Sequence, residues 1–236
     1  MPFDEIVPPV AGGRVFETSV RPGLADVAPS GRVRLDGLAR LMQDVAYADI
    51  EDAGVADLSL WVVRRMRMRI QGFPRFAQDL RARTWCSALA RLWAERRTTL
   101  EGDGALVEAA GLWVHLDPLT GRPVPFPEPL ERMLAKSAAG RTVKARLRHP
   151  PPPADAERSD WRFRVTDLDM AAHVNNAAYW EPLEERLIAG PEPQSLDAEI
   201  EFREPAQAGD VAVLHGDGAL WIAGADGVVH ASILIG

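Results

Sequence analysis

The apolar residues of this 236-residue chain recur with two different spacings, and each spacing predicts a different element. Over residues 31–54 they recur every three or four positions, which predicts one helix. Over residues 61–70 they alternate with arginines, which predicts a strand with one polar and one apolar face. Three more strands are predicted over residues 80–86, 92–100 and 105–116.

The same order of elements returns in the second part of the chain. Residues 174–188 have helical spacing and are followed by Gly190 and Pro191, which end helices. The strands predicted after this helix cover residues 196–202, 211–214, 220–223 and 228–235. One helix followed by strands, with no helices between those strands, indicates antiparallel sheets and an α+β fold.

A proline-rich stretch separates the two parts of the chain. Nine of the 19 prolines lie in residues 117–160, where only a short helix near residues 130–136 is expected. The sequence therefore predicts an N-terminal unit over residues 1–140 and a linker over residues 141–160. A C-terminal unit that carries the chemistry is predicted over residues 161–236.

Short similarities between the two units indicate an internal duplication. Residues 88–93 resemble residues 218–221, and residues 109–114 resemble residues 231–235. A unit with one helix on one apolar sheet face can pair edge to edge with its copy, which protects both edges. This architecture is the double hotdog, in which two helix-plus-antiparallel-sheet units form one continuous sheet.

Composition and charge narrow the classes of function. The net charge of −7 and the pI near 5.3 argue against a general nucleic-acid binder. Cys86 is the only cysteine, which excludes a disulfide framework and a cysteine zinc cluster within one chain. The histidines have no metal-site spacing, and no cofactor is expected. Neither a signal peptide nor a run of roughly 18 apolar residues is visible, so a cytoplasmic protein without a membrane span is expected.

The densest group of polar residues lies directly before the second predicted helix. Its members are Asp167, Asp169, His173, Asn175 and Asn176. Carboxylate and imidazole groups activate water, and the free backbone N–H groups at the start of a helix polarise a carbonyl. The simpler alternative is that Asp169 or Asn175 only caps the helix.

This group resembles the signature of the acyl-ACP thioesterases, tandem hotdog enzymes that end fatty-acid synthesis. The resemblance rests on residues 167–169, residues 173–176 and Tyr179, and it extends over residues 14–236. In the first unit it is carried by Trp61 to Arg65, Phe73 to Phe76, Asp79, and Thr84 with Trp85. Because residues 173–176 alone also resemble single-hotdog acyl-CoA thioesterases, the tandem arrangement favours the acyl-carrier-protein branch.

The resemblance implies that Asp169 and His173 are catalytic. It also contains a departure, because the motif asparagine of the family falls on Ala171. The chain therefore lacks one side chain that orients the substrate in the family.

A third catalytic residue is implied on the strand after this helix. The acidic residue of the family matches Glu204 if one residue is deleted, and Glu201 is the other possibility. A cysteine of the family falls on Pro205, so this position offers no cysteine nucleophile.

A mechanism of hydrolysis follows as a hypothesis. The thioester carbonyl would accept hydrogen bonds from backbone N–H groups near Val174 and Asn175, which form the predicted substrate-binding set with Asn176. A catalytic carboxylate would act as general base on a water molecule or attack directly, and the histidine would orient the partner groups.

The predicted function is hydrolysis of fatty acyl-ACP to free fatty acid and carrier protein, within fatty-acid biosynthesis. The partner is acyl carrier protein or, alternatively, coenzyme A as the acyl carrier. A catalytically silent acyl-binding protein is the alternative from another class. The tandem arrangement is compatible with a monomer or a homodimer, and neither the acyl chain length nor the carrier follows from the sequence.

Two basic clusters are possible docking surfaces for an acidic carrier protein. One is the strand face with Arg65, Arg67 and Arg69. The other is the basic run in residues 141–148 of the linker. Solvated sheet surface without a partner is the simpler interpretation of both.

Overall fold

The computed structural model describes residues 7–56, 60–117 and 119–236. The first half contains β1 (Phe16–Val20), α1 (Leu35–Asp52), β2 (Leu60–Gly72), β3 (Leu80–Leu89), β4 (Trp93–Gly102), β5 (Ala105–Leu116) and α2 (Glu128–Ala138). The second half contains β6 (Glu157–Phe163), α3 (Glu181–Ala189), β7 (Leu196–Phe202), β8 (Gly209–Gly216), β9 (Ala219–Ala223) and β10 (Val229–Ile235). Short 3-10 turns are η1 (Leu24–Asp26), η3 (Val165–Asp167) and η4 (Ala178–Trp180).

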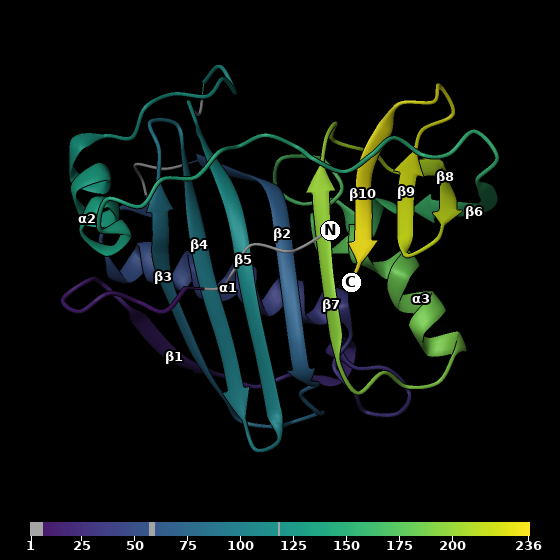
Figure 1. Cartoon of the computed structure of the whole chain (residues 1–236), viewed down its shortest axis with the longest axis horizontal. Coiled ribbons are helices and arrows are strands. Elements are labelled where there is room, and N and C mark those ends of the chain that lie inside the picture. The colour runs from purple at the N-terminus through teal and green to yellow at the C-terminus, as the bar shows by residue number, and fades with distance from the viewer. Residues whose placement is uncertain (1–6, 57–59, 118) are drawn as a thin grey trace.

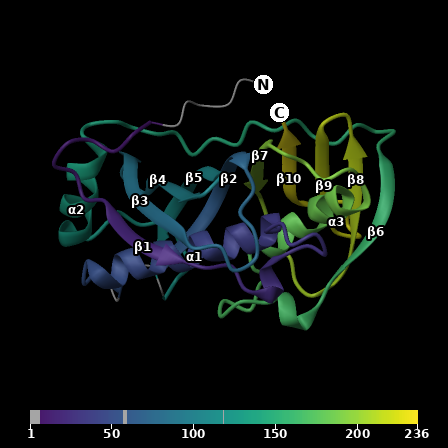
Figure 2. The same ribbon diagram turned by 90° about the horizontal axis from the view of Figure 1, so that it is seen from below.

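All ten strands form one sheet in the order β1-β3-β4-β5-β2-β7-β10-β9-β8-β6 (Figure 1). Outward from the central pair β2–β7, each half repeats the same strand order. Antiparallel pairing of β2 with β7 sets Arg67 opposite Glu199. The helices α1 and α3 lie on one face of the sheet (Figure 2). The α+β double hotdog predicted from the sequence is confirmed.

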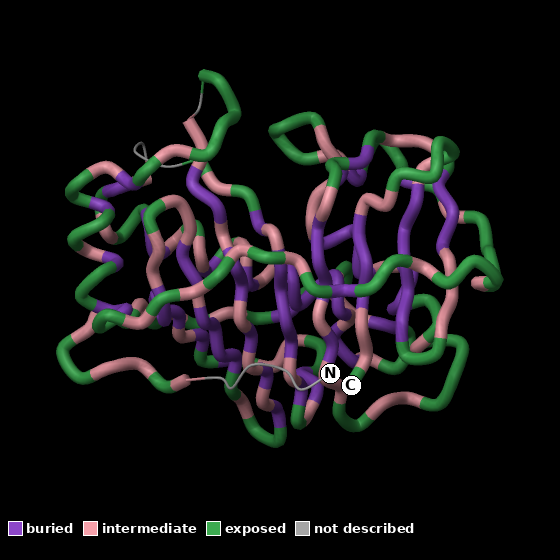
Figure 3. The backbone as a smooth tube through the Cα atoms, turned by 45° about the horizontal axis from the view of Figure 1, so that its top comes forward, coloured by how far each residue is buried: buried purple, intermediate pink, exposed green. Residues whose placement is uncertain are grey.

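The core lies between this face of the sheet and the two central helices. Leu35, Leu38 and Met42 of α1 are buried in one continuous cluster with Met68 of β2 and Trp180 of the second half. Figure 3 shows that buried residues follow the central strands, whereas the turns are exposed. Full burial of each such side chain stabilises the fold by about 1.5–3 kcal/mol. The two halves therefore share one core.

The sequence missed two strands, β1 and β6, which are the two edges of the sheet. Both are short, and β6 buries only Phe163. An edge strand has one neighbour and little apolar burial, so its sequence lacks a strong period of two. Because β6 begins at Glu157, a strand starts inside the predicted linker, and the domain boundaries stay a prediction.

The second helix starts later than its sequence pattern indicates. Residues 174–177 precede η4 and α3 as a loop and turn, because backbone bonds to other segments hold them. No helix of the described residues is long and apolar enough to cross a membrane. The N-terminal segment considered for a signal peptide includes residues 1–6, which lie outside the described residues.

The outer face of the sheet is crossed by residues 141–156, which we call the strap (Figure 2). On this face Arg65 and Arg67 are only 4% and 3% exposed. Arg67 bonds Asp197 of β7, with 2.6 Å between Nη2 and Oδ2, and Arg65 faces Glu199. Arg65 and Arg67 are therefore neither solvated surface nor docking surface, because they are buried against acidic side chains of β7, whereas Arg69 is partly exposed.

Candidate active site

A tight loop carries the residues predicted to be catalytic. The Asp169 N–H donates to the His173 carbonyl over 2.9 Å, and the Ala172 N–H donates to the Asp169 carbonyl over 3.0 Å. An isolated bridge between Leu168 and Val174 closes the loop. The structure therefore brings the backbones of Asp169 and His173 together at the base of one short loop.

The two side chains of this loop differ in exposure. Asp169 is exposed, and its Oδ1 accepts the Ala171 N–H over 2.9 Å. His173 is half-buried, and its imidazole bonds none of the described residues. Asp169 Oδ2 and both imidazole nitrogens are thus available to water or substrate, as general acid–base chemistry requires.

Asn175 closes a turn directly before the second helix and is not its N-cap, which is Ala177 for η4 and Trp180 for α3. Its side-chain Oδ1 accepts the Ala177 N–H over 2.8 Å, and its carbonyl accepts the Ala178 N–H over 2.9 Å. This turn leads into a continuous helical stretch through η4 into α3. The polar side chain of Asn175 therefore fixes the position of the loop relative to the helix.

The backbone donors expected for the thioester carbonyl are occupied. The Val174 N–H donates to the Ala206 carbonyl over 3.0 Å, and the Asn175 N–H donates to the Asp167 carbonyl over 2.8 Å. The neighbouring N–H groups of His173 and Asn176 bond nothing among the described residues. The expectation for Val174 and Asn175 as donors is therefore corrected, because long-range backbone pairing uses both groups.

Tyr179 ties this helix start to the loop that carries Glu204. Its hydroxyl accepts the Ala206 N–H over 2.8 Å, and its ring packs against Phe163 and Phe202. Burial, and after it the negative charge of Asp169, raises the pKa of Tyr179 to about 12. The phenol is therefore neutral.

The two acidic candidates of the second half differ in location. Glu204 is exposed, two residues before Ala206, whose carbonyl bonds Val174. Its segment thus adjoins the candidate site. Glu201 is fully buried on the outer face, where it accepts the N–H groups of Arg148 and His149 over 2.5 and 3.0 Å. Glu201 is excluded as a catalytic residue, because it lies across the sheet and holds the strap.

The sequence did not single out Glu181, at the first position of α3. Burial raises the pKa of its carboxyl, and the charges of Asp36 and Asp167 raise it further. Glu181 also lines a surface pocket of about 330 Å³ with Trp161 and Arg164. Its only sequence signal was an acidic residue in the first helical turn, which is common without function.

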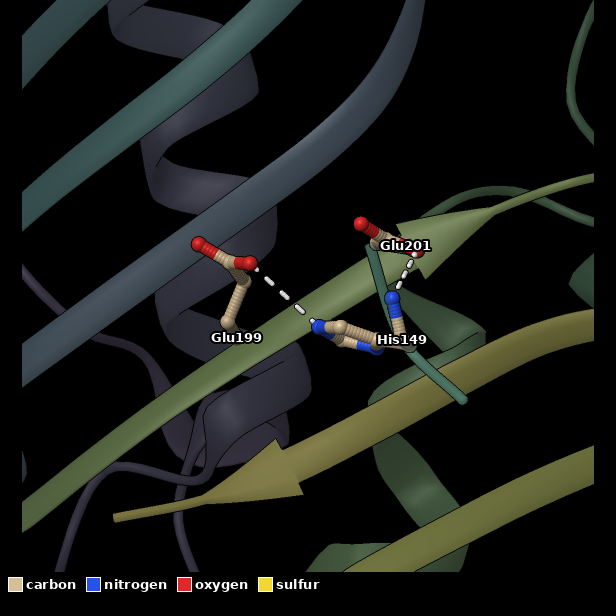
Figure 4. A group of neighbouring side chains, drawn as sticks. All are labelled: His149, Glu199 and Glu201. Atoms are coloured by element: carbon tan, nitrogen blue, oxygen red, sulfur yellow. Dashed lines mark hydrogen bonds and ion pairs between the residues drawn. The ribbon is translucent and has the colours of Figure 1, made fainter. Parts of the chain in front are cut away.

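His149, Glu199 and Glu201 form a compact group on the outer face (Figure 4). The ring atoms of His149 lie 3.0 Å from the Ser232 hydroxyl and 3.3 Å from Glu199. Glu201 already accepts two backbone N–H groups of the strap. Because each member has a hydrogen-bond partner in the protein, the group is explained as an anchor for the strap.

The candidate loop has a counterpart in the first half of the chain. The Ala28 N–H donates to the Arg32 carbonyl, and the Gly31 N–H donates to the Ala28 carbonyl, both over 2.8 Å. The Val33 N–H donates to the Pro74 carbonyl over 2.9 Å, as Val174 does to Ala206. Ala28 and Arg32 therefore occupy the backbone positions of Asp169 and His173, and this copy has no carboxylate or imidazole there.

Two sequence profiles match successive parts of the chain. The N-terminal domain of acyl-ACP thioesterase matches residues 13–132, and the C-terminal domain of the same enzymes matches residues 151–217. The chain belongs to the acyl-ACP thioesterase family. The first match covers β1 to β5 and the second covers β6 to β8, so each match lies in one half of the sheet. The chain is a thioester hydrolase.

The chain is also similar to one further protein in sequence and to two solved structures in fold. An uncharacterized protein of Mycobacterium tuberculosis is 28% identical over 203 residues, which cover 85% of this chain and 81% of that protein. An acyl-ACP thioesterase from Bacteroides thetaiotaomicron has a similar fold, with a TM-score of 0.76, 14% identity and coverage of 94% and 96%. The 12:0-ACP thioesterase from Umbellularia californica has a TM-score of 0.74, 17% identity and coverage of 96% and 98%.

Proposed function

We propose that this protein hydrolyses the thioester of fatty acyl-ACP to free fatty acid and carrier protein, in cytoplasmic fatty-acid biosynthesis. The observation that carries the proposal is the loop that holds Asp169 and His173 at the start of the second helix. The matches to both domains of the family support the carrier protein as the partner. One chain already contains both hotdog units, so it is proposed to act as a monomer or homodimer.

In the proposed reaction a water molecule attacks the thioester carbonyl carbon. Asp169, or Glu204 from the adjoining segment, takes one proton from this water. The N–H groups of His173 and Asn176, which bond no described residue, donate to the carbonyl oxygen as it becomes negative. The carbon–sulfur bond then breaks, and the leaving thiolate takes up the proton.

The substitution Asp169→Asn tests this assignment. We expect the rate of fatty-acid release from acyl-ACP to fall by at least about 10²-fold, because the amide cannot accept the proton of water. Asp217→Asn is the matched control, since Asp217 is an exposed turn residue of the same half. Turnover of Asp169→Asn close to that of the control would rule out Asp169 as the base.

A panel of acyl-ACP and acyl-CoA substrates separates the proposed function from its alternatives. Release from acyl-CoA alone would favour the coenzyme A branch. Release of fatty acid from neither substrate, together with saturable binding of fatty acid, would favour a catalytically silent acyl-binding protein. The absence of the motif asparagine at Ala171 gives a physical reason for this alternative.

A further inference from the structure

The strap is held on the sheet by hydrogen bonds near its start and again around residues 148–150. Near its start, the Arg141 carbonyl accepts the Leu89 N–H over 3.0 Å, and the Val143 carbonyl accepts the Trp93 indole N–H over 2.8 Å. Further along, Glu201 accepts two strap N–H groups, and the Pro150 carbonyl accepts an indole N–H over 2.8 Å. These bonds fix a segment that has no regular secondary structure of its own.

Strap residues alternate strictly between the sheet and solvent over residues 141–150. The odd-numbered residues are partly or fully buried, and the even-numbered residues are exposed. Lys144, Arg146 and Arg148 are all even-numbered, so their charged groups share the solvent side. At about 3.3 Å per residue of extended chain, these cations follow one another every 6 to 7 Å.

This row of cations differs from the other basic cluster of the chain. Arg65 and Arg67 are buried against the acidic residues of β7, whereas Lys144 and Arg146 form no ion pair with the described residues. The chain as a whole has a net charge of −7. The outward side of the strap is therefore a fixed positive strip on an acidic protein.

The far end of the strip is connected to the candidate site by a short path. The N–H groups of Arg148 and His149 bond Glu201, and Glu204 follows three residues later. The carbonyl of Ala206, in the same segment, bonds Val174 beside His173. A macromolecule bound to the strip therefore lies near the C-terminal end of β7. The chain runs from there, through residues 203–206, to the loop that holds Asp169 and His173.

We propose that Lys144, Arg146 and Arg148 form the docking surface for the acidic acyl carrier protein. This inference rests on the proposed function, because it names the surface that receives its protein partner. Complementary charge selects and orients a partner and increases the rate of encounter. A row fixed by backbone bonds presents that charge without further ordering of the chain.

The double variant Lys144→Glu/Arg146→Glu tests the docking surface. We expect the KM for acyl-ACP, relative to the KM for a short soluble acyl thioester, to increase at least about tenfold, because like charges across an interface repel. The dependence of KM on salt should weaken as well. The matched control is Arg132→Glu/Lys136→Glu on α2, which makes the same charge change on exposed side chains at another part of the surface. An unchanged ratio, or an equal change in the control, would overturn the inference.

A binding measurement separates this inference from the proposed reaction. Titration of the full-length protein with unacylated carrier protein reports docking without hydrolysis. If the wild type binds carrier protein, the strap variant does not, and the wild type hydrolyses no acyl-ACP, the docking surface is supported and the proposed reaction is rejected. Hydrolysis of acyl-ACP with identical binding by wild type and variant would reject the surface alone.

Discussion

The loops at residues 24–35 and 165–176 have the same backbone hydrogen-bond pattern, but their side chains differ in role. Each begins with a 3-10 turn, closes with a valine that donates to a distant carbonyl, and leads into a central helix. In the second loop the two inner positions hold the exposed Asp169 and the half-buried His173. In the first they hold the buried Ala28 and Arg32. The same geometry holds the candidate catalytic residues in one half and a structural contact in the other.

The structural contact of the first loop reaches across to the second half. The side chains of Arg32 and Glu184 of α3 form an ion pair and are only 2% and 3% exposed. Glu184 also accepts the N–H of Leu35, the first residue of α1, over 3.0 Å. The Arg32 guanidinium lies 4.8 Å from the centre of the Phe73 ring. The position that holds the candidate residue His173 in the second half thus holds Arg32 in the first half, where it links the two halves.

The largest effect is expected when this link is broken. Glu184→Gln should lower the free energy of unfolding by about 3–5 kcal/mol, because it leaves the Arg32 charge buried without a counter-ion. Denaturant unfolding measures the change. The matched control is Glu192→Gln, which breaks the solvent-exposed pair of Arg75 with Glu192 between the same halves and should leave the stability nearly unchanged. Equal losses in the two variants would contradict the structural role of Arg32.

A smaller effect is expected at Tyr179, whose counterpart in the first half is Leu38. Tyr179→Phe should cost about 1–3 kcal/mol, because the buried Ala206 N–H loses its acceptor. The first half needs no such acceptor, since Pro74 at the position of Ala206 has no N–H. Thermal unfolding of Tyr179→Phe measures this cost, and a stability equal to wild type would argue against the hydroxyl as the acceptor.

The same substitution has a pH dependence with a definite sign. Folding raises the pKa of Tyr179 from its ordinary 10.0 to about 12. The folded state therefore holds this proton more tightly, so the contribution of the phenol is complete below pH 10 and is lost between pH 10 and 12. The difference in free energy of unfolding between wild type and Tyr179→Phe should therefore become smaller from pH 10 to pH 12. A difference that stays constant over this range would contradict the prediction.

The smallest effects, of opposite sign, are expected at the left-handed residue of each loop. Gly31 has φ +83° and Ala172 has φ +58°. Gly31→Ala should cost about 1–2 kcal/mol through backbone strain alone, since an added Cβ meets no atom within 4 Å. Ala172→Gly removes that strain but increases unfolded-chain entropy, so a gain below about 1 kcal/mol is expected. Melting temperatures that shift in the same direction would show that the loops are not equivalent in backbone energy.

The sequence predicted those parts of the fold that depend on local pattern. The spans of α1, β5 and β7 agree closely with their apolar periods, because each has one face in the core. The candidate loop was also singled out, because five polar residues lie within ten positions of one another. The equivalent first loop was missed, since only Asp26 and Val33 match their counterparts in residue type.

The predictions that the structure corrected concern contacts between segments that are distant in the sequence. The N–H groups of Val174 and Asn175 looked available because no local acceptor was visible, but the carbonyls of Ala206 and Asp167 take them. Glu201 and Arg65 looked exposed because no pattern reveals the strap above them. A sequence period identifies the two faces of a strand, but not which other segment covers the polar one.

The bond that Glu184 accepts from the first residue of α1 has a consequence for how the chain unfolds. Two halves that folded separately could each lose or gain structure alone. Here Glu184 of α3 accepts the N–H of Leu35 and pairs with Arg32, so the start of α1 depends on the second half. We therefore expect the chain to unfold as one cooperative unit. Deletion of either half would also remove contacts that the other half needs.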